Sequence, residues 1–207
     1  LLFVSPRFLF PIDSGGKIRT TQVLRGMKGG QFHIKLMSPA TQDLVMRHRD
    51  DLAQVCDEFE SWPAPPEGWR GMLSRGWHLI DALPMPVRVD RSDAAAASVV
   101  SALEARPDVV VFDFLHAAVL APPRLDTPSV IFTHNVEAQI FARHLDVARS
   151  AWMRFIWRNQ LGKMRAYEAQ TLARFDVVVA VSAEDSHLFE QDYGVRDAHV
   201  IPTGVDL

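Results

Sequence analysis

The sequence has 207 residues, of which 48% are apolar, 22 are basic and 25 are acidic, so its formal net charge is −3. This length fits one large domain or two small ones with a substantial core, and the charge gives no support for broad nucleic-acid binding. The single cysteine, Cys56, excludes an internal disulfide and a cysteine-rich metal site, and it favours a reducing, cytoplasmic compartment. No apolar run approaches the roughly 20 residues of a membrane-spanning helix.

Short apolar segments alternate with longer amphipathic ones along the chain. The pattern predicts strands at 1–5, 32–38, 108–114, 129–134, 176–182 and 199–202. It predicts helices at 17–28, 42–58, 93–105, 137–148, 150–174 and 183–193. The strand segments are largely apolar on both alternating faces, which is typical of strands buried on both sides of a parallel sheet. We therefore expect an α/β fold, a Rossmann-like open and mainly parallel sheet with helices on both faces.

Ligands of such sheets bind beyond the carboxyl ends of the strands. Four segments follow predicted strands and should emerge together at that edge: Pro11–Lys17, Phe114–His116, Thr133–Glu137 and Ser182–Asp185. This convergence is the first indication of where a functional site would lie.

The segment 62–86 is less regular, because it is rich in proline and tryptophan. One interpretation is a proline-bounded connection with a short helix whose aromatic residues pack on the core. The alternative is a lip on the acceptor side or an element that touches a membrane.

The stretch FPIDSGGKIRT places adjacent glycines, Gly15 and Gly16, between a predicted strand and a predicted helix. The N–H groups and dipole of a helix N-terminus suit an anion such as phosphate, and Lys17 and Arg19 at this end would favour an anionic partner. Neither the Walker pattern nor the Rossmann G-x-G-x-x-G pattern fits this loop. A tight turn with no ligand remains the alternative.

The segment IFTHNVEAQ carries three polar residues where a predicted buried strand ends: His134, Asn135 and Glu137. His134 is either a hydrogen-bonded structural residue or a functional one, and its position at the carboxyl end of a strand favours function. Asn135 is a plausible N-cap for the next helix, and Glu137 suits its positive end.

The predicted helix at 150–174 is cationic and amphipathic. Arg154, Arg158 and Arg165 fall on one stripe, and the apolar residues fall roughly opposite, namely Trp152, Met153, Ile156, Trp157 and Met164. The arginines either form a solvated face above a buried apolar one, or they contact anionic lipid or a lipid-phosphate acceptor.

Motifs for metal or hydrolytic chemistry are absent from the sequence. The histidines show neither H-x-x-x-H nor H-E-x-x-H spacing, and there is no G-x-S-x-G elbow. The segment VFDF carries one acid, Asp113, without the D-x-D pair that would hold a divalent ion. We therefore expect no metal and no cofactor.

Four segments, in this order, resemble parts of one known family: PIDSGGKIR after the first strand, FTHNVE, YEAQTLARFDVVVAVSAEDSHLF and VIPTGVD. Together they are similar to the N-terminal, acceptor-side half of retaining GT-B glycosyltransferases of family 4 (group 1). Within that family they resemble the branch associated with bacterial exopolysaccharide synthesis.

The resemblance implies roles for particular residues. Gly15 and Gly16 match a glycine-rich loop beside the donor diphosphate and the acceptor, and His134 matches a histidine that contacts the donor sugar. The catalytic candidates are therefore His134 and Gly16. The candidates for binding the donor phosphate or the acceptor are Gly15, Gly16, Lys17, Arg19, Asn135 and Glu137. Glu168 and Asp176 fall in a segment that is structural in the family.

The resemblance also implies a domain arrangement. Residues 1–200 would form the N-terminal domain, and 201–207 would begin a hinge to a C-terminal domain that carries the nucleotide-sugar site. The partners would be a nucleotide sugar and a glycan or lipid-linked acceptor, with no nucleic acid. The fragment would be inactive alone, and the protein would be cytoplasmic or peripheral at the inner face of the plasma membrane. The alternatives are half of a GT-B-like nucleotide-sugar epimerase and a non-enzymatic, flavodoxin-like binding module.

Overall fold

The computed structural model describes residues 1–63 and 81–202, and the irregular segment predicted at 62–86 lies largely outside them. The strands are β1 Leu2–Val4, β2 Lys35–Pro39, β3 Glu58–Trp62, β4 Val110–Asp113, β5 Ser129–Phe132, β6 Val177–Ala180 and β7 His199–Val200. The helices are α1 Gly15–Met27, α2 Gln42–Arg47, α3 Arg49–Ala53, α5 Met85–Asp90, α6 Asp93–Glu104, η2 Leu115–Leu120 (3-10), α7 Glu137–Val147, α8 Ala151–Leu172 and α9 Ala183–Tyr193. Within these residues, no helix combines the length and apolarity needed to cross a membrane.

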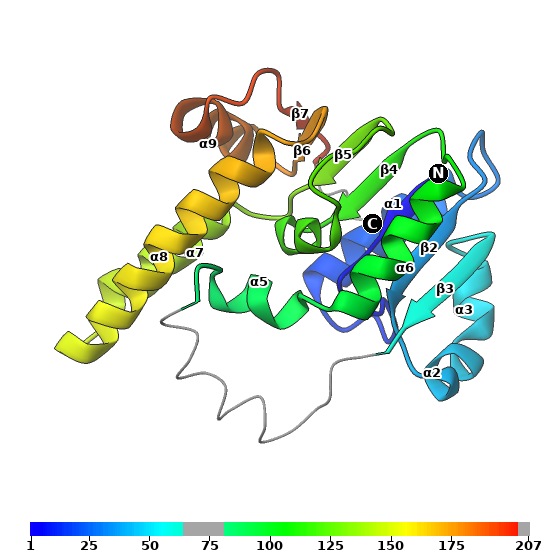
Figure 1. The fold of residues 1–207 in the computed structure, drawn as a ribbon, viewed down its shortest axis with the longest axis horizontal. Coiled ribbons are helices and arrows are strands. Elements are labelled where there is room, and N and C mark those ends of the chain that lie inside the picture. The colour runs from blue at the N-terminus through cyan, green and yellow to red at the C-terminus, as the bar shows by residue number, and fades with distance from the viewer. Residues whose placement is uncertain (64–80, 203–207) are drawn as a thin grey trace.

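The strands form one parallel sheet in the order β3-β2-β1-β4-β5-β6-β7 (Figure 1). The chain first runs from β1 outward to β3 and then returns to the other side of β1 to add β4. The strand order therefore reverses between β1 and β4, and ligands of open α/β sheets bind at such a reversal point. The predicted fold class is confirmed.

Two apolar cores lie on opposite faces of the sheet, because successive side chains of a strand point to opposite faces. Leu2 and Val4 join the core that is covered by α5 to α9, whereas Phe3 joins the core that contains Leu24 of α1 and Leu52 of α3. This double burial explains why the strand segments read as apolar runs rather than as alternating ones.

The single helix predicted at 42–58 was wrong in its continuity and in residues 54–58. The structure has two short helices over 42–53, and the edge strand β3 follows at Glu58–Trp62. Among the strands that the structure describes, β3 pairs with β2 alone, and its Glu60 forms an ion pair with Lys35 at 2.6 Å. An edge strand with charged side chains lacks the apolar run by which the buried strands were recognised.

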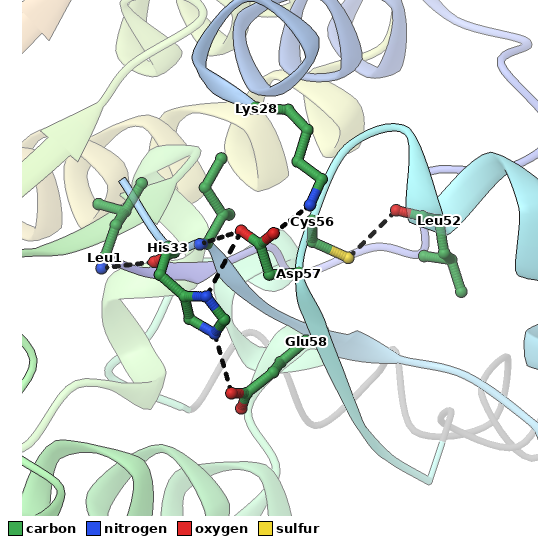
Figure 2. Close-up of polar contacts among 8 residues, drawn as sticks. Leu1, Lys28, His33, Leu52, Cys56, Asp57 and Glu58 are labelled. Carbon is green, nitrogen blue, oxygen red and sulfur yellow. Dashed lines mark hydrogen bonds and ion pairs between the residues drawn. The ribbon is translucent and has the colours of Figure 1, made fainter. Parts of the chain in front are cut away.

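The amino-terminal edge of the sheet is held by local polar contacts (Figure 2). Asp57 forms an ion pair with Lys28 and accepts a hydrogen bond from the backbone N–H of Ile34 at 2.7 Å. His33 contacts Glu58 at 2.9 Å, and the histidine side chain is 67% exposed. These contacts fasten the end of α1 and the start of β2 to the start of β3.

Candidate functional site

Helix α1 begins at Gly15, so the glycine pair forms the first helical turn rather than a loop before it. Neither Gly15 nor Gly16 has a positive φ, and the backbone dihedrals therefore do not require glycine. Space requires it at one position: a Cβ on Gly16 would lie 2.5 Å from Cζ of Phe114, whereas a Cβ on Gly15 would meet nothing within 4 Å. Gly16 is therefore a point of close approach, and the approaching group is an aromatic ring.

Phe114 follows β4 and has φ 67° and ψ 144°. A bulky residue at positive φ is strained, and such strain persists where the surrounding structure holds it. The Phe114 ring contacts two of the predicted site residues. Its tip packs against Gly16, and its face stacks on the His134 ring at a centroid distance of 3.8 Å and an interplanar angle of 13°. Gly16 and His134 therefore lie on the same side of the molecule, joined by one aromatic ring.

Asp113, the last residue of β4, binds the His134 ring through its carboxylate. Its Oδ1 lies 2.6 Å from Nε2 of His134, while its Oδ2 accepts hydrogen bonds from the hydroxyls of Thr20 at 2.9 Å and Ser5 at 3.2 Å. Asp113 is fully buried and His134 is 4% exposed. Side chains from β4, α1, and the loops after β1 and β5 thus meet in one satisfied network, which fixes the imidazole orientation.

Arg19 completes this network from α1. Its Nη1 lies 3.1 Å from Nδ1 of His134. A guanidinium only donates, so Nδ1 must accept, and the imidazole proton then lies on Nε2 and is donated to Asp113. Burial lowers the pKa of Arg19, and the carboxylates of Asp113 and Asp185 oppose that shift. The geometry therefore describes a neutral histidine between a cation and an anion.

Lys17 lies beside the site but is turned toward the loop before α1. Its Nζ forms an ion pair with Asp13 at 3.0 Å and donates a hydrogen bond to the Pro11 carbonyl at 3.1 Å. The Lys17 contact lowers the pKa of the exposed Asp13. The conflict between the helix dipole and the two basic residues is thus eased by Asp13 for Lys17 and by Asp113 and Asp185 for Arg19.

Asn135 and Glu137 follow His134 but point to different surroundings. Asn135 is exposed and does not cap α7, whose N-cap residue is Val136. Glu137 is buried, with its Oε2 3.4 Å from Nε2 of His116, whose Nδ1 lies 3.7 Å from Asp90. The predicted N-cap role of Asn135 was therefore wrong.

Glu168 of α8 supplies the missing cap from a distance. Its carboxylate accepts hydrogen bonds from the backbone N–H of Glu137 at 2.6 Å and of Ala138 at 3.1 Å, and from the Tyr193 hydroxyl at 2.5 Å. Burial raises the pKa of Glu168 to about 7, although these hydrogen bonds lower it. Glu168 thereby fixes the start of α7, three residues after His134.

The network contains residues that the sequence did not single out. Asp113 was considered only as half of an absent metal-binding pair, Phe114 was placed at the functional edge but given no role, and Thr20 was not considered. The signal available was the position of Asp113, a lone acid at the carboxyl end of an apolar strand. Among the residues that the structure describes, no three His, Cys, Asp or Glu side chains are placed to hold a metal ion.

A hollow of about 680 Å³ opens elsewhere, between α6 and the loops before β4 and β5. Its lining includes Leu103, Pro107, Asp108 and Thr127, so it lies at the amino edge of the sheet and does not include His134 or Gly16.

The carboxyl edge differs from this hollow in the groups that it presents to a ligand. It offers a helix N-terminus, a cation and an oriented imidazole, a set that can bind an anionic group and a polar ligand beside it.

Comparison with known proteins assigns a family. The model of Glycosyltransferase Family 4 matches residues 43–207, which include Asp113, Phe114 and His134 but not the glycine pair. A search of curated proteins finds no match. Because the matched residues make up most of the chain, this protein belongs to Glycosyltransferase Family 4.

Proposed function

We propose that this chain is the N-terminal, acceptor-side half of a retaining glycosyltransferase that uses a nucleotide-diphosphate sugar. The observation that carries the proposal is the packing of Gly16, Phe114 and His134 into one wall at the carboxyl edge of the sheet. In a member of Glycosyltransferase Family 4, that wall lies where ligands of open α/β sheets bind. The facing wall, with the nucleotide site, would belong to a second α/β half joined through residues 201–207.

The chemistry asked of this wall is mostly positioning and electrostatic stabilisation. The bond between the anomeric carbon and a diphosphate oxygen breaks, and the acceptor hydroxyl oxygen forms a new bond to that carbon. The hydroxyl proton passes to the departing diphosphate. The first N–H groups of α1, at Gly15 and Gly16, would stabilise the charge that develops on the diphosphate.

His134 would orient the donor sugar, because Asp113 fixes its ring and leaves Nδ1 as an acceptor. In the structure Arg19 donates to Nδ1. A sugar hydroxyl would take that place when Arg19 turns toward a phosphate. Arg19 would then be a positioning residue for the sugar as well as a ligand of the anion. Lys17 and Asn135 are proposed to act from the rim of the same site, whereas Glu137, buried beside His116, is proposed to support the start of α7 next to it.

Further parts of the proposal come from the family resemblance. The product would be a surface polysaccharide or a glycolipid of the exopolysaccharide type. The acceptor would be a glycan or a lipid-linked sugar, and no metal would be needed. The protein would act in the cytoplasm, at the inner face of the plasma membrane.

The test is the release of nucleoside diphosphate by the complete protein, incubated with a panel of nucleotide sugars and with crude lipid or glycan acceptors. His134→Ala should lower kcat/KM about 100-fold or more, because an oriented group at the reacting sugar is lost. The matched control is His33→Ala, since His33 lies exposed at the opposite edge, and it should leave the rate unchanged.

Product analysis by NMR separates the alternatives. Transfer with the anomeric configuration of the donor supports a retaining transferase. Turnover of the nucleotide sugar without an acceptor would instead support an epimerase. If the complete protein releases no nucleoside diphosphate from any donor, the proposal is abandoned.

A further inference from the structure

Helices α7 and α8 form an antiparallel hairpin whose end projects away from the sheet (Figure 1). Large apolar side chains are exposed at this end: Val147 is 72% exposed, Trp152 61%, Phe155 56% and Met153 39%. The Trp152 and Phe155 rings stack with a centroid distance of 5.7 Å. We call these four residues, together with Arg149, Arg154 and Arg158, the hairpin tip.

The core does not reach the hairpin tip. Farther along α8, Leu161, Met164 and Tyr167 are buried, but residues 151–155 are all exposed. Trp157 lies at the boundary between the buried and the exposed part of α8. It is half-buried, packs against Phe141 and stacks on His144. One of the two interpretations of the sequence buried the apolar face of this helix. For Trp152 and Met153 that interpretation was wrong, because the apolar stripe continues beyond the body of the domain.

The hairpin tip is also strongly basic. Residues 143–158 carry four arginines and one acid, Asp146, in a chain whose formal net charge is −3. Arg149, Arg154 and Arg158 are exposed, and none of them forms an ion pair with the residues that the structure describes. Exposed aromatic and aliphatic groups therefore stand beside unneutralised cations on one projecting end.

We propose that the hairpin tip docks on an anionic lipid surface. Tryptophan and arginine both favour the boundary between lipid headgroups and acyl chains, since each has an apolar body and a polar or charged end. The charge of the tip is complementary to anionic headgroups. A projecting end suits a planar bilayer, and the excess of four arginines over one acid at this end argues against a self-complementary contact with a second copy.

The direction of the hairpin relates this surface to the candidate site. Glu168 on α8 is level with Glu137, the first residue of α7, because its carboxylate binds the backbone there. Trp152 precedes Glu168 by 16 residues of continuous helix, so the tip stands about 24 Å from that level along α8. Since α7 begins just after the carboxyl end of β5, the hairpin extends from the same edge that carries His134. A docked tip would hold that edge toward the membrane.

Vesicle flotation tests the proposal on the purified protein, without reference to transferase activity. Vesicles of phosphatidylcholine alone are compared with vesicles of equal parts phosphatidylcholine and phosphatidylglycerol. We expect binding to the mixed vesicles, a blue shift of tryptophan fluorescence on binding, and loss of binding near 1 M NaCl, where the Debye length is only about 3 Å.

Two variants remove the two components of the surface. Arg154→Gln with Arg158→Gln should lower the vesicle partition coefficient about fivefold per charge removed. Trp152→Ala with Phe155→Ala should abolish binding and the fluorescence shift. The matched control, Met46→Ala with Arg47→Gln, changes an exposed apolar residue and an exposed arginine on α2 and should bind like the unchanged protein. Melting curves verify that each variant folds.

Three outcomes would overturn the proposal. The first is no binding of the unchanged protein to anionic vesicles, and the second is equal binding by the hairpin-tip variants and the control. The third is a dimer, seen by light scattering, that is lost in the aromatic variant while vesicles do not bind. That result would assign the tip to a contact between copies of the chain.

Discussion

The two edges of the sheet use polar residues in opposite ways. At the carboxyl edge, Asp113 and His134 are buried, and their partners come from elements far apart in the sequence. At the amino edge, Lys28, Asp57 and His33 are partly or largely exposed, and their contacts join the end of α1 and the start of β2 to the start of β3 (Figure 2). An exposed ion pair contributes little to stability, whereas a buried polar group without its partner costs much more. Loss of one polar partner should therefore destabilise the protein more at the carboxyl edge than at the amino edge.

The sharpest test of this contrast is Asp113→Ala. The substitution leaves two buried donors, on Thr20 and His134, without their acceptor, whereas the Ser5 hydroxyl keeps the Arg7 carbonyl at 3.0 Å, so the free energy of unfolding should fall by about 3 kcal/mol. Urea denaturation measures the change. Asp113→Asn is the control, because its amide retains an acceptor for His134 and the two hydroxyls can reorient. An equal loss in both variants would contradict the role given to the hydrogen bonds.

The pH dependence of stability should depend on Glu168. Its pKa is raised from 4.5 to about 7 in the folded protein, so the folded state binds the proton more tightly than the unfolded state. This group's contribution is fully present below about pH 4.5 and is lost as the pH rises to about 7, a difference of about 3 kcal/mol. Glu168→Gln should flatten the stability profile in that window. Glu190→Gln, on the exposed side of α9, should leave the profile unchanged.

The glycine pair offers a comparison between adjacent positions. Gly16→Ala places a methyl group against the Phe114 ring and should cost about 2 kcal/mol in stability. Gly15→Ala enters open space in the first turn of α1 and should be neutral or stabilising by up to about 1 kcal/mol. Thermal denaturation of both variants makes the comparison. Adding Phe114→Ala to Gly16→Ala should recover part of the loss. Equal effects at the two positions would show that the close packing is unimportant.

The smallest effect is expected at the amino edge. Lys28→Met removes the ion pair with Asp57, which retains its hydrogen bond from Ile34. The free energy of unfolding should change by less than about 1 kcal/mol, and the change should shrink in high salt. A loss as large as that of Asp113→Ala would remove the distinction between the two edges.

The sequence predicted the sheet because its strands are buried on both faces and therefore read as apolar runs. It missed β3, since an edge strand with Glu58 and Glu60 carries no such run. The convergence of Gly16 and His134 was predicted from topology alone, through the rule that parallel strands end at a common edge.

Contacts that depend on distant residues could not be predicted in this way. Asn135 has the right residue type and position for a cap, but Glu168 takes that role from α8. Asp113 had no recognisable spacing, because its partners Ser5, Thr20 and His134 lie on other elements. The exposure of Trp152 depends on where the core ends along α8, and helical periodicity does not encode that limit.

The pairing of β1 with β4 has a consequence for how ligands and folding are linked. The hydrogen bond from Ser5 to Asp113 spans 108 residues of chain, so it joins the first three strands to the last four along one seam. Contacts of such long range form only after a large loss of chain entropy, and they separate early when the sheet opens along that line. A ligand seated on this seam would hold both parts together, and its affinity would appear directly as added resistance to global unfolding.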